Sequence, residues 1–332
     1  MTTKEEVNLE TYRKNPRQLK PLMKQELLKP SGDFQPILEA VINDPRLRLE
    51  IRDQRFNVYY KGGSLMRISG SKPPWTLEFD KKYFKGKDCE LPTTLPKLFL
   101  SIADTHAWIT AFPGLMRGMD AWFKPHSKSE KDAEQHPRER IHCQAMATAN
   151  SNMAAILSTD YLVLDLEYQW AHRRFDMVAA KRHRTVDDTT GWVEPDLVFI
   201  EVKSEYSACS GTAGLGDHAS DYRDIIKAKG GKSVLGIKQE FKEVITQKTD
   251  LGLLDKSFGF KSFSLGVPEL LIVFVNIDPN ASSLQTSMQE VQAVAESLGN
   301  DARIRFMQLV SPNYVMTAKA VLPMERPIAE SK

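Results

Sequence analysis

Hydrophobic and polar positions follow two different periods in the first part of the chain. Between residues 47 and 79, apolar side chains recur at every second position, and turns such as Gly62-Gly63 separate the runs. A period of two is typical of strands with one buried and one polar face. Helical spacing precedes this region, at 9–29 and 34–42, and follows it at 95–122, as one helix or two. The pattern predicts an N-terminal α+β domain built on an antiparallel meander.

The second half of the chain has another order of elements. Six segments show helical or strand-like periodicity in turn: a helix at 130–157, strands at 161–168, 174–180 and 193–203, a helical stretch at 217–248 and a strand at 270–277. We place a domain boundary near residue 125, which gives domains 1–125 and 126–332. The expected fold class is α/β, α+β overall, with a central mixed sheet flanked by helices in the C-terminal domain.

The strand at 193–203 ends in an unusual way, because two charges follow its apolar run. Side chains alternate along a strand, so Glu201 and Lys203 lie on one face and Val202 lies on the other. Burial of such charges is costly unless they are paired or hold an ion. Taken alone, Glu-x-Lys is also common as an exposed ion pair where a strand leaves a sheet.

The preceding strand carries one acid, Asp176, and a polar turn connects the two strands. Such a pair predicts an antiparallel hairpin that brings Asp176 beside Glu201. Asp196 is an alternative partner, but its odd offset from Glu201 directs it to the other face unless a bulge forms near Pro195. We therefore favour Asp176.

An aspartate on one strand and Glu-x-Lys on the next resemble the active site of the PD-(D/E)XK nuclease superfamily, and the order of the six segments resembles its αβββαβ core. The resemblance does not extend to the first 124 residues. It implies a restriction-endonuclease-like fold and a Mg²⁺-dependent nuclease, with Mn²⁺ as a substitute. By this resemblance, Asp176, Glu201 and the main-chain carbonyl of Val202 hold the metal, and Lys203 lies by the attacking water.

The superfamily often adds an acid from the helix before the first strand. We choose Glu139, which lies nearest to the apolar part of that helix, and Glu167 on the first strand is an alternative. Glu139 could equally be a solvated helix charge, since carboxylates are mostly exposed.

Basic residues flank the hairpin on both sides. Arg173 and Arg174 begin its first strand, and Arg182 and Arg184 follow that strand. These four arginines could contact phosphates on either side of a cut, although basic turns are usually just solvated.

The composition bears on the binding partners and on the cellular compartment of the protein. The net charge of +2 neither requires nor excludes a nucleic-acid partner. The three cysteines have no metal-binding or disulfide spacing, which suits a reducing cytoplasm. The sequence shows no apolar run of membrane-spanning length and no signal peptide, so we expect a cytoplasmic protein without a membrane partner.

Together these features predict a metal-dependent nuclease that hydrolyses phosphodiester bonds. DNA is the expected substrate by family habit, RNA is possible, and restriction or DNA repair are plausible settings. Cutting two strands would favour a homodimer. The alternative is a catalytically silent nucleic-acid-binding or scaffolding protein on the same fold, which would bind no Mg²⁺ at Asp176 and Glu201.

Overall fold

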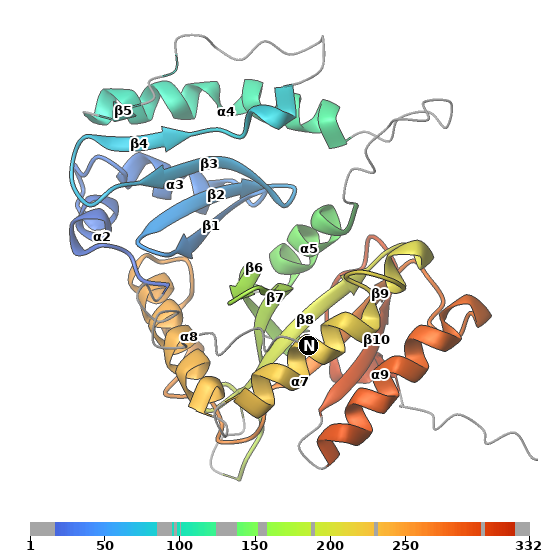
Figure 1. Ribbon diagram of the computed structural model, residues 1–332. Coiled ribbons are helices and arrows are strands. Elements are labelled where there is room, and N and C mark those ends of the chain that lie inside the picture. Colours follow the sequence, from blue (N-terminus) through green and yellow to red (C-terminus); the bar gives the residue numbers. More distant parts are fainter. Residues whose placement is uncertain are drawn as a thin grey trace, which may run out of the picture. The chain divides into compact units, whose positions relative to one another are not determined.

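The protein forms a mixed α/β structure with two sheets (Figure 1). The computed structural model describes residues 17–84, 95, 98–99, 101–123, 138–151, 158–186, 190–228, 232–299 and 303–322. Two compact units divide the chain: Met1–Gln144 with Glu240–Lys256, and Ala145–Gln239 with Ser257–Lys332. The predicted boundary near residue 125 lies outside the described residues.

The first unit contains the antiparallel meander that the period of two predicts. Its five strands are hydrogen-bonded in chain order: β1 (Leu47–Arg52), β2 (Arg55–Tyr60), β3 (Gly63–Ser69), β4 (Trp75–Glu78) and β5 (Leu98–Phe99). In β1, the apolar residues Leu47, Leu49 and Ile51 all belong to the buried core of this unit. The intervening positions therefore lie on the opposite face of the sheet.

Three helices contribute to the core of this unit: α2 (Pro21–Leu28), α3 (Gln35–Asn43) and α4 (Ile102–Phe123). Helix α4 is continuous through Pro113, where the sequence pattern allows a break. A proline inside a helix removes one main-chain hydrogen bond and strains the preceding turn. Buried Phe112 and Leu115 lie on either side of Pro113, so their packing on one helix face offsets that cost.

The second unit contains a six-stranded mixed sheet in the order β11-β10-β9-β8-β7-β6. Its strands are β6 (Tyr161–Trp170), β7 (Arg173–Lys181), β8 (Asp196–Lys203), β9 (Glu269–Val275), β10 (Ile304–Leu309) and β11 (Val321–Leu322). Strands β6, β7 and β8 pair antiparallel, which confirms the predicted hairpin. Strands β8, β9 and β10 pair parallel, and every residue of β8 and β9 is buried, as expected for the centre of such a sheet.

Helices supply the connections that parallel pairing requires. Helix α5 (Arg138–Ala149) precedes β6, α7 (Leu215–Lys227) and α8 (Lys232–Asp250) join β8 to β9, and α9 (Gln285–Leu298) joins β9 to β10. Helices α7 and α9 pack against each other, and α7 also packs on β7 and β9 (Figure 1). The predicted order of helix, three strands, helix and strand is confirmed. Among the described helices, none is both long enough and apolar enough to cross a membrane.

Candidate active site

The hairpin of β7 and β8 brings two carboxylates into line. Met177 on β7 pairs with Ile200 on β8, so the next positions in the same register are Asp176 and Glu201. The main-chain N–H of Val202 donates a hydrogen bond to Oδ2 of Asp176 over 2.9 Å. The side chain of Asp176 therefore reaches the end of β8 that carries Glu201.

The alternative acid, Asp196, lies at the other end of β8, where it pairs with Lys181 on β7. Five residues of strand separate it from Glu201, which corresponds to about 16 Å. Its carboxylate accepts a hydrogen bond from the hydroxyl of Ser264 and lies 3.3 Å from Nδ1 of His183. The structure thus brings Asp176, and not Asp196, to Glu201.

Glu201 and Lys203 form a buried pair on one face of β8. The ammonium of Lys203 donates to Oε1 of Glu201 over 2.9 Å, and each residue is only 3% exposed. They are therefore not the solvated surface pair that an isolated Glu-x-Lys suggests. Ionic groups withdrawn from water in this way need further polar partners.

A loop supplies a second partner for the lysine. Lys203 donates to the main-chain carbonyl of Ala213 over 3.0 Å, and the N–H of Ala213 donates to Oδ2 of Asp217 over 2.9 Å. Ala213 has a φ of +62°, which is uncommon for a residue with a side chain. The ammonium thereby ties the loop before α7 to the end of β8.

Helix α7 adds a residue that the sequence analysis did not identify, His218. Its Nε2 lies 2.8 Å from Oε1 of Glu201, and the residue is buried. His218 is spaced three residues from buried Leu215 and four from buried Tyr222, so it occupies the inward face of the helix. A histidine among the apolar positions of a helix is the signal that could have marked it.

These contacts define the charge state of the site. Burial alone would raise the pKa of Glu201, but the hydrogen bond and charge of His218, together with Lys203, hold that pKa below its usual value. Burial alone would lower the pKa of His218, but its hydrogen bond and attraction to Glu201 raise it. Glu201 is therefore an anion held between two donors.

One oxygen of Glu201 has no donor. Oε2 is buried and accepts no hydrogen bond from the described residues. A buried carboxylate oxygen without a partner is costly, whereas a hard cation would satisfy it. Within the described part of the chain, no group of three or more His, Cys, Asp or Glu is arranged to hold a metal. Two carboxylates and a carbonyl still suit Mg²⁺, which binds few protein ligands and keeps several waters.

The two further acids are placed differently. Glu139 lies in the first turn of α5 and belongs to the first unit, whereas Asp176 and Glu201 belong to the second. Glu167 lies on β6, has a φ of +51°, and its Oε1 accepts a hydrogen bond from Arg174 over 2.5 Å. Glu167 thus has a cationic partner of its own.

Three of the four predicted phosphate-binding arginines have acidic neighbours. Arg173 contacts Asp224 at 2.7 Å, Arg174 pairs with Glu167, and Arg182 lies 3.9 Å from Asp160. Arg184 is exposed. Their role in nucleic-acid binding stays a prediction.

Comparisons with known proteins give little similarity. No protein-family model matches the chain, and no curated protein matches it significantly. Among solved structures, SfsA from Pyrococcus furiosus in complex with Ca²⁺ is similar at 11% identity and a TM-score of 0.21, over 84% of this chain and 88% of that one. This structural relation is weak, and no activity follows from it.

Proposed function

We propose that the protein is a metal-dependent nuclease that hydrolyses phosphodiester bonds. The observation that carries this proposal is the unpartnered, buried Oε2 of Glu201, beside Asp176 and Lys203 at the end of β8. Perturbed, buried ionisable groups of this kind concentrate at functional sites. The residue pattern resembles the PD-(D/E)XK superfamily, whose members act mainly on DNA, so DNA is the proposed substrate.

The proposal assigns the metal to the carboxylates of Asp176 and Glu201 and to the main-chain carbonyl of Val202. Mg²⁺ is the proposed cofactor, with Mn²⁺ as a substitute. When bound, the metal would neutralise charge on the scissile phosphate and lower the pKa of a water.

The residues of the chain have separate roles. Lys203 presents a fixed positive charge that would offset charge developing on the phosphate and orient the water. His218 and Lys203 both hold Oε1 of Glu201, which leaves Oε2 available as a ligand that would hold a metal. A cytoplasmic role in restriction or DNA repair, carried out by a homodimer with two sites, completes the proposal.

The test is a cleavage assay on plasmid, linear duplex, single-stranded DNA and RNA, with Mg²⁺ or Mn²⁺. Lys203→Met removes the positive charge but keeps most of the side-chain volume. Lys319→Met, at an exposed position of the second unit, is the matched control. Both variants are purified identically and compared with the wild type in the presence and absence of chelator.

Cleavage by the wild type and by Lys319→Met, lost in Lys203→Met and with chelator, supports the proposal. Equal cleavage by all three proteins points to a contaminant and rejects this site. Absence of cleavage in all of them, together with no binding of Mg²⁺ or Mn²⁺, would favour the silent scaffold instead.

A further inference from the structure

The polar face of the five-stranded sheet, opposite to the core of this unit, carries an unusual set of charges. It is only partly exposed: Glu50 and Arg52 are buried, whereas Arg55 and Arg67 are partly exposed. In β1, the apolar residues enter the core, and the alternate positions Arg48, Glu50 and Arg52 lie on the other face. On the same face, Arg52 pairs with Arg55 of β2, and the neighbouring Asn57 pairs with Arg67 of β3. We call Arg48, Arg52, Arg55 and Arg67 the arginine face. Adjacent strands lie about 4.8 Å apart, so these cations extend about 10 Å across three strands.

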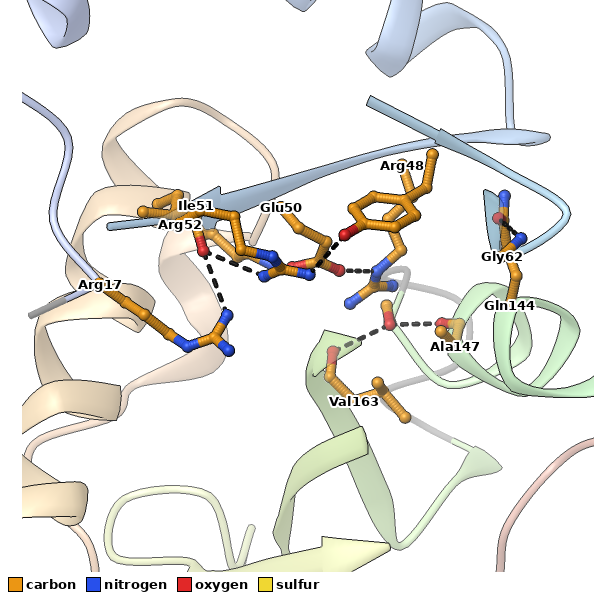
Figure 2. Close-up of polar contacts among 12 residues, drawn as sticks. Arg17, Arg48, Glu50, Ile51, Arg52, Gly62, Gln144, Ala147 and Val163 are labelled. Carbon is orange, nitrogen blue, oxygen red and sulfur yellow. Dashed lines mark hydrogen bonds and ion pairs between the residues drawn. The ribbon is translucent and has the colours of Figure 1, made fainter. Parts of the chain in front are cut away.

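The carboxylates on this face are shared among more than one cation. Glu50 is fully buried and pairs with Arg48 (Figure 2). It also pairs with Lys248 of α8 at 2.6 Å. The only other carboxylate in the described strand pairs of this face is Glu78, whose ion pair with Arg67 at 3.3 Å is exposed. Surface pairs of that kind contribute little. Asp53, in the turn between β1 and β2, adds a third carboxylate near these arginines. The four arginines still outnumber the three carboxylates.

Arg55 is the clearest sign of this excess. Its guanidinium makes no hydrogen bond or ion pair with any residue that the structure describes, and its Nε is buried without a partner. Burial lowers the pKa of Arg55, and the charges of Arg67 and Arg52 lower it further, against a smaller opposing effect of Asp53. A half-buried guanidinium that forms no ion pair would be stabilised by an anionic ligand.

The register makes the arrangement costly. Arg52 and Arg55 are directly opposite on adjacent antiparallel strands, where like charges destabilise the sheet. Arg52 donates hydrogen bonds to the carbonyl of Ile51, as Figure 2 shows, and to the hydroxyl of Tyr59. A ligand with several negative charges would turn this repulsion into attraction.

We propose that the arginine face binds the phosphate backbone of the nucleic acid that the nuclease cleaves. This inference rests on the proposed function for the identity of the partner. Guanidinium groups match phosphate oxygens in a bidentate geometry, and the two partly exposed arginines, Arg55 and Arg67, lie on adjacent strands, which suits a ligand with more than one phosphate. Contacts to the backbone position a nucleic acid without reading its sequence. The face would therefore supply affinity with little sequence preference.

Binding is measured separately from cleavage, by fluorescence anisotropy with labelled duplex DNA, single-stranded DNA and RNA in EDTA. The test variant is Arg55→Gln with Arg67→Gln. The control removes the same two charges from exposed positions of the first unit, as Lys29→Gln with Arg117→Gln. The face variant should bind at least about tenfold more weakly. Its plot of log affinity against log salt concentration should also be shallower by about two.

Equal weakening by the control variant, or unchanged binding by the face variant, would overturn the proposal. Equally strong binding of a polyglutamate peptide would also overturn it, because that result would show general attraction to anions. If the double variant fails to fold, Arg55→Gln alone serves, since it breaks no hydrogen bond or ion pair within the described chain. A further outcome is that the face variant loses binding while the wild-type protein cleaves no nucleic acid. That outcome would reject the proposed nuclease activity and support the proposed binding role of the arginine face.

Discussion

His218 and Glu201 come from different elements and meet at 2.8 Å, with Nε2 of the imidazole against Oε1 of the carboxylate. Strand β8 supplies the acid, and the packing of α7 on β7 and β9 positions the imidazole. The carboxylate can rotate only by breaking this contact and the one to Lys203. Helix α7 therefore sets the orientation of the proposed metal ligand.

Loss of His218 should impair the site without removing a ligand. Groups that orient metal ligands typically contribute 10- to 100-fold to metal affinity or activity, so we expect His218→Ala to lower kcat by about that factor. The concentration of Mg²⁺ needed for half-maximal activity should rise. His218→Gln retains an N–H donor and should recover part of the loss.

The control for this prediction is His172→Ala, an exposed histidine in the turn between β6 and β7. It should leave both kcat and the Mg²⁺ dependence unchanged. A glutamine variant no better than the alanine variant would show that His218 acts only in packing.

Metal binding should stabilise the folded protein. A ligand at 100 times its Kd adds about 2.7 kcal/mol to the free energy of unfolding, so Mg²⁺ or Mn²⁺ should raise the Tm of the wild type. Asp176→Asn and Glu201→Gln should lose this response. The amide carbonyl oxygen introduced by the first substitution can still accept the N–H of Val202, so the lost response would reflect charge.

Glu194→Gln, at an exposed position just before β8, is the matched control and should keep the full increase in Tm. Differential scanning fluorimetry at several metal concentrations measures all four proteins. A rise in Tm that persists in Asp176→Asn and Glu201→Gln would place the metal elsewhere.

Glu50 should make stability depend on pH. Burial alone would raise its pKa, but Arg48, Lys248 and Arg52 lower it from 4.5 to about 2. A depressed pKa stabilises the folded state above pH 4.5, and this contribution is lost as the pH falls from 4.5 towards 2. At neutral pH it amounts to about 3 kcal/mol.

Urea unfolding of Glu50→Gln should therefore show a deficit of about 3 kcal/mol at pH 7 that shrinks below about pH 4. The control Glu39→Gln, at an exposed position of α3, should differ little from the wild type at either pH. A deficit for Glu50→Gln that is independent of pH would mean that lost packing, rather than charge, is responsible.

The sequence reveals the candidate site only where the information is local. Strand periodicity and a polar turn are sufficient to predict the β7–β8 hairpin, and the register then places Asp176 by Glu201. The sequence marks His218 only as a histidine among the apolar positions of a helix. Its contact with Glu201 depends on how α7 packs on the sheet, which no local pattern records. The pairing of Glu50 with Lys248 likewise joins residues far apart in the chain.

Two further differences have the same origin. The helical pattern allows a break at Pro113, yet burial on both sides of the proline keeps α4 continuous. The arginine face likewise cannot be predicted from the sequence, because the alternation of apolar and polar residues shows only that one side of the meander is polar. Strand register is needed to show that Arg52 and Arg55 are opposite each other.

Two glycines allow backbone strain to be separated from steric contact. Gly62 and Gly252 both belong to the first unit and have φ values of +73° and +72°. A Cβ at Gly62 would clash with the main-chain carbonyl of Arg140, whereas a Cβ at Gly252 would meet no atom of the described residues within 4 Å. Left-handed backbone costs a residue with a side chain about 1–2 kcal/mol, and both alanine variants should lose that amount.

Gly62→Ala should lose about 1–3 kcal/mol more than Gly252→Ala, because a main-chain carbonyl cannot move aside as a flexible side chain can. The N–H of Gly62 also donates to Oε1 of Gln144, so a shift of this turn would disturb a second contact with α5. Urea unfolding of both variants measures the difference. Equal losses would mean that the turn relaxes freely away from Arg140, and the close approach of these two segments would then contribute nothing to stability.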